Sequence, residues 1–137
     1  MKIKSLLLTS VLALTTSSFA QDKAEELFTQ KCSICHFKKV PEDKSTVIAP
    51  PAPGLMFHMN ELFSTNKEIK SHMVSFSLNP TKESAKLKGA VKRFGLMPSQ
   101  KDLISEEELT QVVEYMIHNF GMTAAEHDMN QKKHSQN

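Results

Sequence analysis

The chain has 137 residues, with two cysteines, six prolines and no tryptophan, which is enough for one compact domain. It carries 17 basic and 15 acidic residues, a formal charge of +2, and this near balance argues against a general nucleic-acid binder. No apolar stretch long enough to span a membrane follows the first 20 residues, so we expect a soluble product.

The first 20 residues are typical of a secretory signal peptide. Residues 1–4 are basic, residues 6–14 form a short apolar run, and residues 18–20 place small side chains at a cleavage site. We expect residues 1–20 to be removed and the product to reach the periplasm; an uncleaved membrane anchor is the alternative. Removal takes away Lys2 and Lys4, so 17 − 2 = 15 basic residues would balance the 15 acidic ones.

The first predicted helix covers residues 22–31, where apolar side chains recur at helical spacing behind Asp22. It runs into the segment KCSICHFKK at residues 31–39. Residues 37–55 have no periodicity and are rich in proline, so they predict a long irregular loop without a helix. A loop of that length in a compact domain is usually functional or surrounds something.

Three further helices are predicted beyond this loop. Thr65 and Glu68 form a capping box for a helix that ends at Asn79-Pro80, and a shorter helix follows over residues 81–89. Ser105 and Glu108 begin the clearest helix, which we expect Gly121 to end. Residues 122–137 are polar and are expected to form a disordered tail. With no strand pattern, the sequence predicts an all-α domain over residues 21–121.

Cys32 and Cys35 are the only cysteines, and His36 follows the second one directly. A disulfide closing so small a loop is a poor structural staple. A zinc site commonly needs a second pair of ligands, which the sequence lacks. A redox-active dithiol of this spacing commonly follows a strand, and no strand pattern precedes residue 31. The C-x-x-C-H pattern is typical of covalent haem attachment, in which two thiols add to the haem vinyl groups. The sequence therefore predicts one haem c bound through Cys32 and Cys35, with His36 as an iron ligand.

Met97 is the best candidate for the second axial ligand. Pro98 disfavours helical angles at Met97, and Gly95 allows a sharp turn before it. Met97 is therefore expected on a loop that can direct its side chain at an iron. Alternatives are a ligand near the end of the proline-rich loop or an open, water-bound position. The residues of that first alternative are Met56, His58 and Met59, whereas Met73, Met116, Met122 and His118 are interpreted as packing or surface residues.

The chain resembles the class I (monohaem) cytochromes c from about residue 22 to residue 120. The similarity lies in four motifs in chain order, LFTQKCSICH, APPAPGL, RFGLMP and LISEEELTQVVEYM. The first is similar to the family's N-terminal helix, the second to its glycine-proline loop, the third to its methionine loop, and the fourth to its C-terminal helix. The chain departs from the family at Ala24, where glycine is common, and in a long insert between Leu55 and Arg93.

This resemblance implies a cytochrome c fold, with the N- and C-terminal helices packed together and shorter helices and loops around one haem. It implies that the Pro50 carbonyl orients His36 and that Leu55 and Phe94 wall the haem pocket. It also implies His36 and Met97 as the iron ligands, which gives a closed six-coordinate iron of raised potential.

Such a protein is expected to carry electrons between a donor and an acceptor protein, and a membrane-bound oxidase or reductase is a candidate for either role. We do not expect an enzyme, a nucleic-acid partner or a small-molecule substrate. The alternatives are a haem-based ligand sensor or peroxidase-like enzyme with a labile sixth ligand, and a subunit of a larger redox enzyme.

A basic run precedes and follows the methionine loop. Between residues 82 and 101 it contains one acidic residue, Glu83, against Lys82, Lys86, Lys88, Lys92, Arg93 and Lys101. This run favours a docking face for an acidic partner, and the alternative is an ordinary solvated surface.

Overall fold

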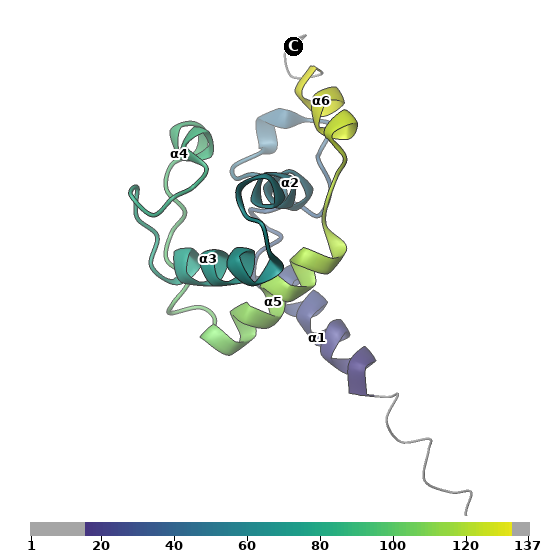
Figure 1. Cartoon of the computed structure of the whole chain (residues 1–137), viewed down its shortest axis with the longest axis vertical. Coiled ribbons are helices and arrows are strands. Elements are labelled where there is room, and N and C mark those ends of the chain that lie inside the picture. The colour runs from purple at the N-terminus through teal and green to yellow at the C-terminus, as the bar shows by residue number, and fades with distance from the viewer. Residues whose placement is uncertain (1–15, 133–137) are drawn as a thin grey trace, which may run out of the picture.

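A computed structural model describes residues 16–132, although not the side chains of residues 16–20 and 131. Within this range the chain forms helices and no strand, which confirms the predicted all-α class (Figure 1). The elements are α1 (Thr16–Lys31), a short 3-10 helix η1 (Lys44–Thr46), α2 (Ala52–Leu62), α3 (Asn66–Leu78), α4 (Lys88–Phe94), α5 (Glu106–Asn119) and α6 (Ala124–Lys132).

Helices α1 and α5 pack against each other, as the sequence predicted for the N- and C-terminal helices, and they meet at one edge of the fold (Figure 1). Phe28 of α1 is fully buried there, with its ring 5.9 Å from that of Tyr115 and 5.0 Å from that of Phe120. Ala24 lies one turn earlier on the same face and is also buried. A small side chain at this point lets the two helices approach closely.

Helix α3 packs against α5 and begins with the predicted capping box. The Thr65 hydroxyl accepts from the Glu68 amide, and the Glu68 carboxylate accepts from the Thr65 amide. An ion pair of 2.6 Å between Lys70 and Glu114 also joins the two helices. Helix α5 begins with the second predicted capping box, formed by Ser105 and Glu108.

Helix α2 begins within the proline-rich stretch that the sequence predicted to be irregular through residue 55. Its first residue is Ala52, and Pro53 occupies the first turn. Proline is tolerated there because the amides of a helix's first turn have no intrahelical acceptor to lose. The prediction was wrong for residues 52–55 because it treated these prolines as helix breakers rather than as a helix start.

Helix α4 also differs from the prediction. Residues 81–87 form turns, and the helix runs from Lys88 to Phe94 instead of ending at Gly89. Gly89 lies inside it, so it is not a stop. Gly95 ends it, with a φ of 86° that favours glycine, and its amide donates to the Val91 carbonyl.

The C-terminal stretch contains helix α6, where the sequence predicted a disordered tail. Thr123 and Glu126 form a reciprocal hydrogen-bonded cap that was overlooked, and Ala124 and Ala125 favour helix. Helix α5 ends at Asn119 with an extended Phe120, and Gly121 does not adopt a positive φ. The expected glycine stop is therefore wrong.

Helix α1 begins at Thr16, six residues before the predicted start at Asp22. No proline or glycine lies between these positions, so nothing in the local sequence breaks the helix. The predicted cleavage point after Ala20 falls inside α1, and residues 1–15 of the predicted signal peptide lie outside the described residues. The domain bounds remain a prediction.

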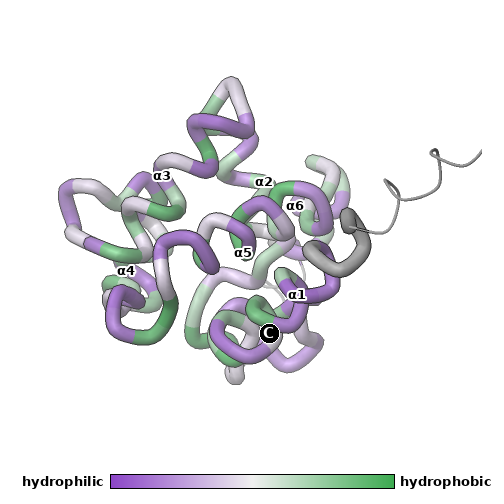
Figure 2. Tube along the Cα trace, turned by 90° about the horizontal axis from the view of Figure 1, so that it is seen from below, coloured by the Kyte–Doolittle hydropathy of each residue, from purple (hydrophilic) through white to green (hydrophobic). Residues whose placement is uncertain are grey.

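Hydrophilic and hydrophobic residues are interspersed along the described chain (Figure 2), and α5 is its most strongly amphipathic helix. The buried side chains come mainly from α1, α2, α3 and α5. None of the helices within residues 16–132 combines the length and the apolar character that crossing a membrane requires.

Candidate haem site

The two cysteines and the histidine lie on one turn at the end of α1. The amide of Cys32 donates to the Phe28 carbonyl at 2.9 Å, which continues the helix by one residue. The amides of Cys35 and His36 then both donate to the Cys32 carbonyl, at 3.1 and 2.8 Å. This turn directs Cys32, Cys35 and His36 to the same cavity, whereas Ile34 between them is 75% exposed.

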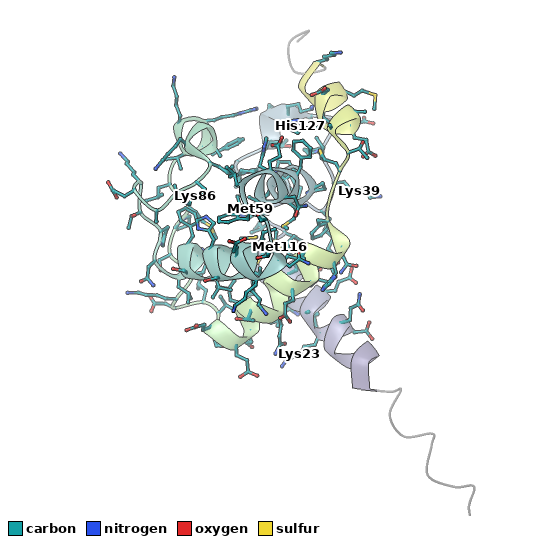
Figure 3. All side chains as sticks on the ribbon, viewed as in Figure 1. Lys23, Lys39, Met59, Lys86, Met116 and His127 are labelled. Atoms are coloured by element: carbon teal, nitrogen blue, oxygen red, sulfur yellow. The ribbon has the colours of Figure 1, made fainter. Side chains whose placement is uncertain are left out.

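That cavity has a volume of about 410 Å³, within the range of cofactor sites. It lies between the cysteine turn, α2, α3, α5 and the segment that includes α4. Met59 and Met116 occupy the space between α2 and α5 (Figure 3). Most of the wall is apolar, with Leu55, Met59, Met73, Phe76, Leu87, Val91, Phe94, Ile104, Leu109, Val112, Val113 and Met116 among its residues.

His36 is held by the carbonyl that the resemblance implied. Its Nδ1 lies 2.8 Å from the Pro50 carbonyl oxygen, and a carbonyl can only accept, so Nδ1 carries the proton. The amide of Ala52 donates to the Phe37 carbonyl at 2.9 Å and ties the proline loop to the histidine segment. Burial lowers the pKa of His36, against the raising effect of the Pro50 hydrogen bond. The imidazole is thus neutral, and its Nε2 lone pair is available to a metal.

The loop that carries Met97 is fastened to the end of α3. The Gln100 amide donates to the Ser77 carbonyl at 2.9 Å, and the Ser99 hydroxyl donates to the Leu78 carbonyl. These bonds satisfy carbonyls that the last turn of a helix leaves without an intrahelical donor. Together with the turn at Gly95, they hold the half-buried Met97 on the wall of the cavity that His36 also lines.

The rival ligand candidates are separated by the fold. Met59 lines the same cavity, Met56 is fully buried but is not part of its wall, and His58 lines a different cavity. Met73 and Met116 also line this cavity, from within helices α3 and α5. Six predicted site residues therefore come together around one cavity: Cys32, Cys35, His36, Pro50, Leu55 and Met97.

The Cys32 thiol is in an environment that disfavours disulfide exchange. Burial, and secondly the neighbouring Cys35, raise the pKa of Cys32 to about 11. Redox-active C-x-x-C motifs have thiols of lowered pKa, so this environment does not favour the dithiol alternative. Among residues 16–132 there is also no group of three or more histidine, cysteine or acidic side chains that could hold a metal ion.

The donor set fits a c-type haem. Two thiols on one turn can form two thioethers, and a neutral imidazole beside them can bind the iron. A methionine on a loop fastened by hydrogen bonds can offer a thioether sulfur as a second ligand. The apolar wall suits the porphyrin ring, whose burial in such a cavity is favourable.

A second cavity of about 520 Å³ lies on the other side of α4. It is bordered by α2, α4, α6 and η1, and it shares Pro50 and part of the α4 segment with the first cavity. Its wall is basic, with one carboxylate, Glu61, against Lys44, Lys86, Lys88 and Arg93.

Residues 19–116 match the family described as "Cytochrome C oxidase, cbb3-type, subunit III", a family of cytochrome c domains. The chain belongs to this family. Membership means a haem-based electron-transfer domain, and the family implies covalently bound haem c, for which Cys32 and Cys35 have the required spacing. Domains of the family are typically electron carriers and usually lie outside the cytoplasm.

This cytochrome c domain is also similar to an uncharacterised protein of Aquifex aeolicus (strain VF5). The two are 27% identical over 128 residues, which covers 80% of this chain and 84% of the relative. A comparison with solved structures finds no significant match.

Sequence reasoning missed one polar side chain of the haem cavity. His72 of α3 lines the cavity together with Met73 and Phe76. In the sequence it is a single histidine on a helix, with no spacing to another ligand. The buried residues of α3 are Ile69, Met73 and Val74. Their burial sets the rotation of α3 about its axis, and that rotation places His72 on the cavity wall.

Proposed function

We propose that this cytochrome c domain is a soluble, exported one-electron carrier with a single haem c. Cys32 and Cys35 form its thioether bonds, and His36 and Met97 are its axial ligands. The haem, when bound, supplies a one-electron iron couple. The observation that carries the proposal is that the cysteine–histidine turn and Met97 line the same apolar cavity.

The protein's own residues orient the ligands and exclude water. Pro50 fixes the imidazole of His36, and Ser99 with Gln100 fastens the loop of Met97. Neither ligand has to leave the iron on electron transfer, so the structure around it changes little. The His/Met pair also raises the reduction potential relative to ligands that favour iron(III) more strongly.

The partners are proposed to be redox proteins that approach the methionine side of the cavity. Ile48 and Leu96 line the cavity and are exposed, so they give its mouth an apolar rim. The basic run lies around the same segment, and all six of its cations are exposed. A partner with an acidic surface would be attracted to this face, which raises the encounter rate at low salt. Export to the periplasm follows from the predicted signal peptide.

A redox titration with spectra on the haem-loaded protein tests this function. We expect one covalent haem by mass spectrometry, low-spin six-coordinate iron, the weak long-wavelength iron–sulfur band in the ferric spectrum, and one reversible one-electron transition. High-spin iron that readily binds CO or cyanide would contradict the carrier and favour a ligand sensor or a peroxidase-like enzyme. Haem-free protein with a free dithiol or a disulfide would contradict the site itself.

A further inference from the structure

His72 is a titratable side chain of the haem cavity for which the electron-carrier chemistry has no use. Its imidazole lies between two aromatic rings, with centroid distances of 5.1 Å to Phe63 and 5.8 Å to Phe76. None of the hydrogen bonds of the described residues involves it, although it is half-buried at the cavity wall. An imidazole held in this way keeps at least one nitrogen available for a proton.

The surroundings of His72 make its charge costly. Burial lowers its pKa, and the positive charge of Lys86 lowers it further. The other titratable or charged groups on the cavity wall are Lys31 at the end of α1 and the turn residues Cys32, Cys35 and His36. The wall residues from α2 and α5 are apolar. No carboxylate lines this cavity within the described residues, so positive charge is not neutralised there.

We propose that His72 is a proton-binding site coupled to the oxidation state of the haem. The inference rests on the proposed function, because it requires the iron to be in this cavity. On reduction, one electron comes from the donor protein and iron(III) becomes iron(II). In those molecules whose His72 is neutral before reduction and becomes protonated after it, one proton from water binds to the imidazole and gives imidazolium. On oxidation by the acceptor, the electron and the proton leave again.

The coupling has a simple electrostatic cause. Reduction removes one unit of positive charge from the cavity, so an imidazolium is repelled less. Two unit charges about 12 Å apart at an effective dielectric constant of about 20 change the proton affinity by roughly tenfold. The linkage is reciprocal, so a bound proton favours the reduced iron by the same factor.

The sign of the pH dependence follows. The pKa of His72 is lower in the oxidised than in the reduced protein. Between these two values the reduction potential falls as the pH rises, because the reduced form alone holds the proton. Above and below that window it is flat. A tenfold change in proton affinity corresponds to a total change of about 59 mV for one electron.

The test is a potentiometric titration of the holoprotein between about pH 5 and pH 9, on wild type and His72→Gln. We expect the wild-type potential to fall by about 59 mV in total, for the tenfold change in affinity, and the fall to shrink in His72→Gln. His58→Gln is the matched control, because His58 lines the other cavity and should leave the slope unchanged. Lys86→Gln should move the window to higher pH, since it removes a charge that lowers the pKa of His72.

NMR titration of the His72 ring in the ferric and ferrous wild type gives a second measurement that needs no variant. We expect its pKa to be about one unit higher in the ferrous protein, for the tenfold change in affinity. Equal pKa values, or an unchanged slope in His72→Gln, would overturn the inference while leaving the electron carrier intact. A loss of low-spin iron in His72→Gln would also overturn it, because His72 would then be a ligand. A wild type without redox-active haem would instead contradict the proposed function.

Discussion

The two cavities on either side of α4 differ in chemistry more than in size. The smaller one, of about 410 Å³, contains both thiols, His36 and Met97 in an apolar wall. The larger one, of about 520 Å³, has four cations on its wall. Among the described residues, its one sulfur-containing side chain is that of Met122, between α5 and α6. The donor set, and not the volume, identifies the cavity with the thiols as the candidate site.

The two walls suit different kinds of binding. An apolar wall excludes water from a porphyrin ring and stabilises such a large hydrophobic cofactor. A small number of fixed polar groups is then enough to orient the cofactor. Cations at a solvated surface keep their hydration, so they cost little free energy of folding. They attract acidic partners through long-range electrostatic interactions. Leu87, Ala90 and Phe94 line both cavities, so this segment is the partition between a cofactor side and a charged side.

The largest expected effect is the loss of haem from the apolar side. The double substitution Cys32→Ser and Cys35→Ser should abolish covalent haem, and each single substitution should lower the yield of holoprotein. Mass spectrometry of purified protein measures both. Ser33→Ala, on the same turn, is the control and should keep the haem. Covalent haem in the double variant would show that the turn is not the attachment site.

The next effect separates the two methionines that compete for the iron. Met97→Ala should lower the reduction potential by on the order of 0.1 V, within the range of about 0.8 V that axial ligands span. It should also let CO bind. Met59→Leu, a change of similar volume in the same cavity, should leave the iron–sulfur band in place. If Met59→Leu removes the band and Met97→Ala does not, the ligand assignment is reversed.

In the basic run of residues 82–101, reversal of one charge should slow electron transfer without changing the haem. Lys92→Glu is expected to lower the second-order rate with the native partner roughly tenfold at low salt, and the loss should fade as salt rises. Stopped-flow rates across ionic strength measure this. Lys23→Glu makes the same charge change on α1, away from α4, and should have little effect (Figure 3). Equal effects of the two variants would mean that only net charge matters.

The smallest expected effect concerns the far wall of the basic cavity. His127 of α6 stacks on Phe57 of α2, with a centroid distance of 4.3 Å and an interplanar angle of 17°. His127→Ala should lower the free energy of unfolding by about 1 kcal/mol, the value of such a ring pair. His118→Ala, an exposed histidine on α5, should change it by less than about 0.5 kcal/mol. A changed haem spectrum in His127→Ala would show that α6 is coupled to the cofactor side.

The residues that the sequence singled out lie together, whereas several bounds of the elements around them differ from the prediction. All six candidate site residues line one cavity, and the Pro50 carbonyl accepts from His36. Their roles toward a haem stay a prediction. These signals are local: the cysteine spacing, the methionine before a proline and the loop motif are each read within a few residues. The bounds of α1, α2 and α4 and the existence of α6 were predicted wrongly. Weak signals such as Pro53 in a first turn depend on what the segment packs against.

The sequence by itself determined the all-α class, the C-x-x-C-H spacing that predicts haem attachment, and the two capping boxes. Covalent spacing and side-chain-to-backbone hydrogen bonds act over three or four residues, so no distant contact is needed to infer them. Only the tertiary structure decided that Met97 lines the same cavity as His36, that His58 lines a different cavity and that His72 lies on the wall of the first one. Those positions depend on how each helix rotates to bury its own apolar face against the others, which is a property of the packed chain.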